Sequence, residues 1–157
     1  MYLIPHVLVG ATIASQVSNP PAAILLSFLS HFALDAIPHS TISVSNLNGK
    51  RFAYTILLGD MFGAGLLALF LSLRGGLGSP QFWLIGLSCL AAVLPDAVRF
   101  PYYFLNYRPA IARFWEKWHQ IIDQEVRHKK LFHGNILMGY LTQIAIIAIC
   151  IITFFFI

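Results

Sequence analysis

The residues best suited to chemistry lie in one apolar stretch, from Ser30 to His39, which contains two histidines and an aspartate. His31, Asp35 and His39 are spaced four residues apart, so a helix would carry all three on one face. Imidazole nitrogen and carboxylate oxygen are the ligands that zinc-like divalent ions bind. The spacing predicts a metal site. The alternative interpretation is a His31–Asp35 hydrogen bond inside a helix bundle, with His39 in a loop.

Pro38 limits the length of the helix that carries this motif. Proline lacks a backbone N–H and disfavours helical angles in the residue before it. We therefore expect the helix to end or kink near Ile37, which leaves His39 at the helix end, where it can turn toward a metal.

The composition is that of a membrane protein. Of the 157 residues, 58% are hydrophobic and only 10% are charged, and the mean hydropathy is +0.74. Soluble domains carry about 25% charged residues. We therefore predict a single integral membrane domain over residues 1–157, with the lipid bilayer as its partner. The net charge of +4 reflects membrane topology, and no nucleic acid partner is expected.

Turn signals divide the chain into helical segments, and the predicted fold class is an all-α polytopic helix bundle. About five transmembrane helices are expected, at about residues 3–17, 20–37, 51–73, 81–98 and 131–157. The first of these is short, because a full crossing needs about 20 residues.

An amphipathic helix is expected at about residues 109–126. Apolar residues recur there at helical spacing: Ile111, Phe114, Trp115, Trp118, Ile121 and Ile122. Polar residues occupy much of the other side: Arg113, Glu116, Lys117, Gln120 and Asp123. This pattern predicts a helix that lies on the membrane surface with its tryptophans at the interface. The alternative is a lid that guides substrate.

The basic residues predict the orientation. With five crossings, the loops at residues 38–52 and 99–130 share one side of the membrane with the N-terminus and carry nine of the ten basic residues. Positive residues favour the cytoplasmic side. We therefore predict a multi-pass protein of the inner (cytoplasmic) membrane whose N-terminus is cytoplasmic.

In this topology, polar residues from all five segments gather at the cytoplasmic face. Histidines open the first and last segments, a histidine closes the second, and an aspartate closes the fourth. Asp60 lies about nine residues inside the third segment, about 13 Å deep. Ionisable residues inside a membrane are costly and indicate function. The predicted metal ligands are His6, His31, Asp35, His39, Asp60, Asp96 and His133.

Seven ligands exceed the four that one tetrahedral ion needs. Two ions about 3.5–4 Å apart are the usual device for hydrolysing phosphoesters. We expect one to three divalent ions, with zinc favoured, a metal-activated water as the attacking group, and Asp35 and Asp60 as the catalytic carboxylates. Arg99 and Arg108 are candidates for binding the substrate phosphate, although the positive-inside bias also explains them. An interfacial site suits a phospholipid or a lipid-linked phosphate.

With these residues identified, the chain resembles small bacterial membrane proteins known as membrane-bound metal-dependent hydrolases. The similarity lies in three motifs of about the first 100 residues: Pro5-His6 followed by Gly10, His31-x3-Asp35-x2-Pro38-His39, and Leu94-Pro95-Asp96. Those proteins look distantly similar to the zinc-dependent phospholipase C and P1 nuclease group. That group is all-helical and cleaves phosphodiesters with a cluster of zinc ions. The resemblance implies a hydrolase in which His6 matches an N-terminal ligand.

Two other functions stay open. A small metal-ion or proton transporter would use intramembrane Asp and His residues as its path, but few polar residues continue toward the far side. A structural or partner-binding membrane protein would use a metal only to hold the helices together. Structural sites are usually closed by four ligands, so the surplus of candidate ligands favours the hydrolase.

Overall fold

The computed structural model describes residues 1–39, 50–98, 109–122 and 136–157, and every regular element within these ranges is an α-helix. The helices are α1 (Leu3–Gln16), α2 (Pro20–Asp35), α3 (Lys50–Arg74), α4 (Pro80–Ala97), α6 (Ala110–Ile122) and α8 (Ile136–Phe156). The predicted all-helical class is confirmed for this part of the chain.

Local sequence signals explain where the helices begin. Asn19 Oδ1 accepts the backbone N–H of Ala22 at 3.0 Å, and a proline opens α2 directly after the cap. Ser79 Oγ accepts the N–H of Phe82 at 3.0 Å, and a proline opens α4 in the same way. Each capping side chain satisfies an N–H that lacks a partner within the helix, and proline at the first position has no such N–H to satisfy.

The helix ends agree with the expected breakers. Helix α2 ends at Asp35, shortly before Ile37, where Pro38 was expected to stop it. Gly76 and Gly78 lie in the turn between α3 and α4 and have φ values of 87° and 75°. Residues with a side chain rarely adopt such positive φ values, whereas glycine does so readily. Helix α6 lies within the amphipathic segment predicted at about 109–126, and residues 123–126 lie outside the described part of the chain.

Three of the described helices are long and apolar enough to cross a membrane. Their apolar windows are Thr55–Arg74, Pro80–Ala97 and Leu137–Phe156. Helices α1 and α2 have 14 and 16 residues, so they are about 21 and 24 Å long, against about 30 Å of bilayer hydrocarbon. Length and composition therefore support three of the five predicted crossings.

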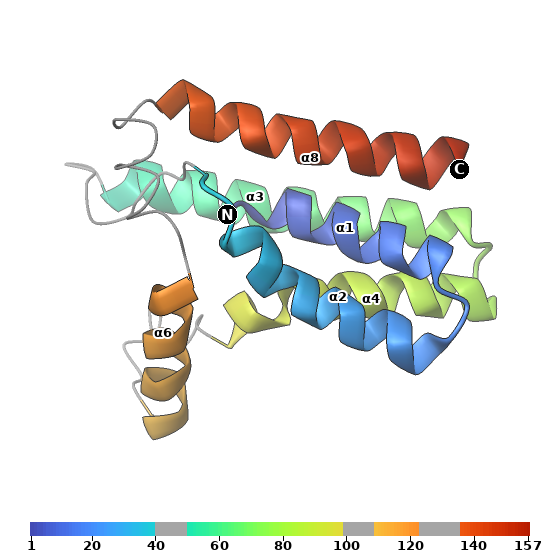
Figure 1. The fold of residues 1–157 in the computed structure, drawn as a ribbon, viewed down its shortest axis with the longest axis horizontal. Coiled ribbons are helices and arrows are strands. Elements are labelled where there is room, and N and C mark those ends of the chain that lie inside the picture. The colour runs from blue at the N-terminus through green and yellow to red at the C-terminus, as the bar shows by residue number, and fades with distance from the viewer. Residues whose placement is uncertain (40–49, 99–108, 123–135) are drawn as a thin grey trace.

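Helix α1 is the centre of the bundle and packs against α2, α3, α4 and α8 (Figure 1). Small side chains allow this close packing, because α1 places Gly10, Ala11 and Ala14 in the buried core. Figure 1 shows that α1, α3 and α8 begin at the end of the bundle where α2 and α4 end. Helix α6 runs across the direction of the other helices at that same end.

Candidate metal centre

His31 links α2 to α4 through a buried hydrogen bond. Its Nδ1 lies 2.8 Å from the backbone carbonyl oxygen of Ala92. A carbonyl oxygen only accepts hydrogen bonds, so Nδ1 carries the proton and donates it. The ring is thereby fixed in one orientation, with Nε2 on the side that faces the carboxylates. Metal-binding histidines are commonly held by their other nitrogen in this way.

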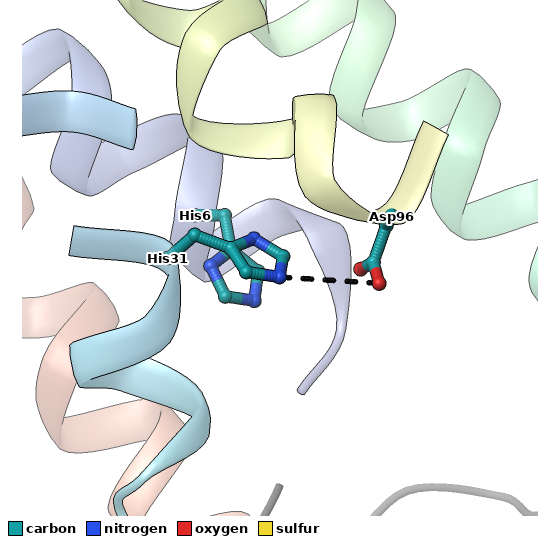
Figure 2. A group of neighbouring side chains, drawn as sticks. All are labelled: His6, His31 and Asp96. Carbon is teal, nitrogen blue, oxygen red and sulfur yellow. Dashed lines mark ion pairs between the residues drawn. The ribbon is translucent and has the colours of Figure 1, made fainter. Parts of the chain in front are cut away.

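Two carboxylates approach His31 Nε2 from different helices. Asp35 Oδ2 on α2 lies 3.2 Å from this nitrogen. Asp96 Oδ1 at the end of α4 lies 3.9 Å from it, as the dashed line in Figure 2 shows. In a neutral ring whose proton is on Nδ1, Nε2 presents a lone pair to both anions. That arrangement is repulsive in a buried site unless a positive charge lies there. A proton on Nε2 or a bound cation would supply it.

His6 on α1 lies against His31. The two rings stack with their centroids 4.2 Å apart and their planes 22° from parallel (Figure 2). His6 is fully buried, and its Nε2 lies 3.4 Å from Asp35 Oδ1. Neither of its ring nitrogens makes a hydrogen bond with the described residues. Leaving a buried polar atom without a hydrogen bond costs about 1–3 kcal/mol. Both nitrogens of the His6 ring are therefore available to a ligand.

Asp35 connects these groups. Its Oδ1 accepts a hydrogen bond from the Met1 ammonium at 2.9 Å and lies beside His6, while its Oδ2 lies beside His31. Almost none of this side chain is exposed. A buried carboxylate requires compensating charge and hydrogen bonds, and the Met1 ammonium supplies Asp35 Oδ1 with both.

Three residues of this cluster form a group that could hold a metal ion. His6, His31 and Asp96 each offer one ligand atom, and these atoms all lie within 4.8 Å of one another. Ligands of a tetrahedral zinc ion lie about 2.0–2.2 Å from it and so about 3.4 Å apart, which requires only a small contraction of this group. The Asp96 side chain is 24% exposed whereas both histidines are buried, so Asp96 is the member of this group that solvent reaches.

His39 lies beyond the end of α2, so the ligand line predicted on one helix face covers only His31 and Asp35. The His39 side chain is buried and its Nδ1 lies 2.8 Å from the carbonyl oxygen of Ile37. The carbonyl of Pro38 accepts a hydrogen bond from Thr142 Oγ1 at 2.9 Å, which fastens this segment to α8. Among the described residues, His39 is not part of the group formed by His6, His31 and Asp96.

Asp60 also lies outside that group in the described part of the chain. Its Oδ2 accepts the backbone N–H of Leu3 at 2.7 Å, at the start of α1. Three other predicted site residues, His133, Arg99 and Arg108, lie outside the described residues.

Several partners of the site were not predicted from the sequence. The Ala92 carbonyl and the Met1 ammonium are backbone groups, which no side-chain pattern can indicate. Trp115 on α6 was predicted only as an interfacial residue, and its Nε1–H also donates to the carbonyl of Pro95 at 3.0 Å, beside Asp96. Glu116 was expected on the polar side of that helix and is instead buried, with 4% of its surface exposed.

Comparison of the chain with protein-family models, with curated proteins and with solved structures gives no match in any of the three.

Proposed function

We propose that the chain is a membrane-embedded, metal-dependent hydrolase that cleaves a phosphoester, with a phospholipid or a lipid-linked phosphate as substrate. One observation carries the proposal. Buried imidazoles from α1 and α2 and a partly exposed carboxylate from α4 converge to within 4.8 Å, and both His6 nitrogens lack hydrogen bonds in the described part of the chain. Such a donor set suits zinc or a similar divalent ion.

Each residue of the cluster has a separate role in the proposed reaction. His6, His31 and Asp96 hold the ion, and the Ala92 carbonyl fixes the His31 ring. Asp35 lies beside both imidazoles and is placed to accept a proton from the attacking water. A divalent ion would supply activation of that water and would stabilise charge on the phosphoryl oxygens.

The membrane arrangement proposed with this function has five crossings, with α1 and α2 joining the three longer helices. The cluster then lies near the face at which α2 and α4 end, which we propose to be cytoplasmic. Helix α6, which exposes Ile111, Phe114, Trp118 and Ile121, lies in the interface there. Supporting this placement, α6 runs across the bundle direction at the end that holds the cluster (Figure 1). A substrate with an apolar tail and a phosphate head would meet Asp96 from this interface.

A second candidate is a metal that only holds the helices together. The complete burial of His6 and His31 favours it, because structural sites are closed whereas catalytic sites keep an open position. The 24% exposure of Asp96 favours the hydrolase instead. The two functions differ in one measurable respect, which is turnover of a phosphoester.

The first test is the metal content of detergent-purified protein, measured by elemental mass spectrometry. We expect at least one tightly bound divalent ion per chain, and its loss in His31→Ala and Asp35→Ala. Ser27→Ala is the matched control: Ser27 is buried on α2 one turn before His31, and its hydroxyl bonds only the Ala23 carbonyl in the described structure. Circular dichroism and gel filtration establish that each variant is folded.

The second test is hydrolysis of phosphomonoester and phosphodiester lipids in mixed micelles. We expect turnover by the metal-loaded protein and none by Asp96→Asn. Bound metal without turnover, together with a lower melting temperature after chelation, would identify a structural metal. Folded protein that binds no divalent ion would overturn both metal functions.

A further inference from the structure

The first turn of α1 lacks a cap of its own. Tyr2 occupies the N-cap position with φ −67° and ψ 158°, and its side chain makes no capping hydrogen bond. The first N–H groups of any helix have no partner within that helix. In this apolar bundle such groups must be satisfied by other elements, because burying an unpaired N–H is costly.

Two other helices supply these partners. Asp60 Oδ2 on α3 accepts the N–H of Leu3 at 2.7 Å, and Gln143 Oε1 on α8 accepts the N–H of Tyr2 at 3.3 Å. Both acceptor side chains are buried. A carboxylate at a helix N-terminus makes a charge-assisted hydrogen bond and also interacts favourably with the helix dipole. Asp60 is therefore the stronger of the two contacts.

The position of His6 depends on this start of α1. His6 lies three residues after Leu3, and its ring stacks on His31 and lies beside Asp35. No described residue makes a hydrogen bond to either ring nitrogen. The backbone of the first turn therefore determines where the ring lies. A shift of α1 would move His6 away from His31 and Asp96.

We infer that Asp60 is a positioning residue: it caps α1 from α3 and thereby fixes His6 in the candidate metal centre, without itself binding the ion. This role replaces that of ligand and catalytic carboxylate, which the sequence suggested for it. The inference rests on the proposed function only where zinc affinity is the measured quantity. The cap on α1 and the position of the His6 ring can be measured without a metal.

The test compares Asp60→Asn with Asp60→Ala. Asparagine keeps an oxygen that can accept the Leu3 N–H but is a poor ligand for a divalent ion, whereas alanine keeps neither property. We expect Asp60→Asn to retain zinc with an affinity within about twofold of the parent, and Asp60→Ala to lose about tenfold, the scale at which residues supporting a ligand act. The affinity is measured by competition with a zinc chelator in detergent.

Ala64→Gly controls for general destabilisation. Ala64 is buried on α3 one turn after Asp60, and glycine there weakens the helix without removing an acceptor from α1. We expect this variant to melt at a lower temperature with unchanged zinc affinity. A zinc loss in Ala64→Gly equal to that in Asp60→Ala would overturn the positioning role.

A second readout does not need the metal. In protein with isotope-labelled histidine, the His6 imidazole NMR signals should shift in Asp60→Ala and stay near the parent position in Asp60→Asn, with or without zinc. If the parent binds no zinc, the proposed function fails while this comparison still tests the cap. Unshifted His6 signals in Asp60→Ala would overturn the inference, and so would equal loss of zinc in both Asp60 variants, because the charge itself would then be required.

Discussion

At the scale of single residues, the direction of a side chain decides what it can do. His31 is useful as a ligand because the Ala92 carbonyl takes its Nδ1–H and leaves Nε2 between two carboxylates. Asp60 has a carboxylate like Asp96, yet it is directed at the backbone of α1. From residue type alone, Asp60 and Asp96 are equally good candidate metal ligands. Their partners in the structure give them different roles.

Gly10 lies where α1 and α4 approach closely enough to exclude a side chain. A Cβ at this position would lie 2.7 Å from the backbone oxygen of Ser88 and 3.0 Å from Ala92 Cβ, so neither neighbour can move without shifting α4. We expect Gly10→Ala to lower the free energy of unfolding by about 1–3 kcal/mol, the usual cost of overpacking. Because Ala92 also holds His31, the variant should bind zinc more weakly as well.

Gly65→Ala is the matched control for Gly10→Ala. A Cβ on Gly65 meets nothing within 4 Å, and the residue lies inside the long apolar helix α3. Alanine is preferred over glycine in helix interiors by about 1 kcal/mol, so this variant should melt at the same temperature as the parent or higher. Equal stability of Gly10→Ala and Gly65→Ala in detergent would contradict the close contact between α1 and α4.

At the scale of elements, α6 contacts α2 and α4 through Trp115. Trp115 stacks edge-on against Phe32 and is tilted against Phe28, with ring centroids 5.9 and 6.3 Å apart, and its indole N–H donates to the Pro95 carbonyl. The neighbouring face of α6 is apolar and exposed. This helix therefore holds the region beside Asp96 while leaving an apolar surface for the bilayer interface proposed above.

Trp115→Phe should loosen α6 without disturbing the bundle. Phenylalanine keeps an aromatic ring but removes the N–H donor, at a cost of about 0.5–1.5 kcal/mol. We expect faster hydrogen–deuterium exchange in α6 peptides and unchanged exchange in α1 and α4. Trp118→Phe is the control, because Trp118 is half exposed. Unchanged exchange in Trp115→Phe would mean that the indole hydrogen bond does not hold α6.

At the scale of the whole molecule, the direction of each helix sets the sidedness of the cluster. The turn between α1 and α2, the turn between α3 and α4, and the C-terminus all lie at the end of the bundle opposite the cluster (Figure 1). If α1 and α2 cross the membrane with the three longer helices, these three points share one side. The two shorter helices decide between five crossings and three.

Single cysteines and a membrane-impermeant maleimide test this topology in right-side-out vesicles. We expect labelling of Ser18→Cys, Leu77→Cys and Ile157→Cys from outside, and protection of Lys117→Cys; all four positions are exposed in the structure. Both native cysteines are buried, so the unsubstituted chain serves as the control. Protection of Ser18→Cys while Leu77→Cys is labelled would show that α1 and α2 enter the membrane without crossing it.

The sequence by itself determined the helices and the chemical character of one end of the bundle. Apolar runs, caps such as Asn19 and Ser79, and breakers such as Pro38 act on near neighbours in the chain, so they can be recognised without a fold. The same local logic put His6 near the start of a helix and Asp35 and Asp96 near the ends of two others.

Only the tertiary structure decided which of these polar groups meet. The Ala92 carbonyl that orients His31, the capping of α1 by Asp60 and the burial of Glu116 all depend on how distant helices pack. Their rotation and spacing are set by small residues such as Gly10, which let α1 and α4 approach closely. A one-dimensional pattern gives the face on which a residue lies, whereas the partner across that face is fixed only when the helices pack.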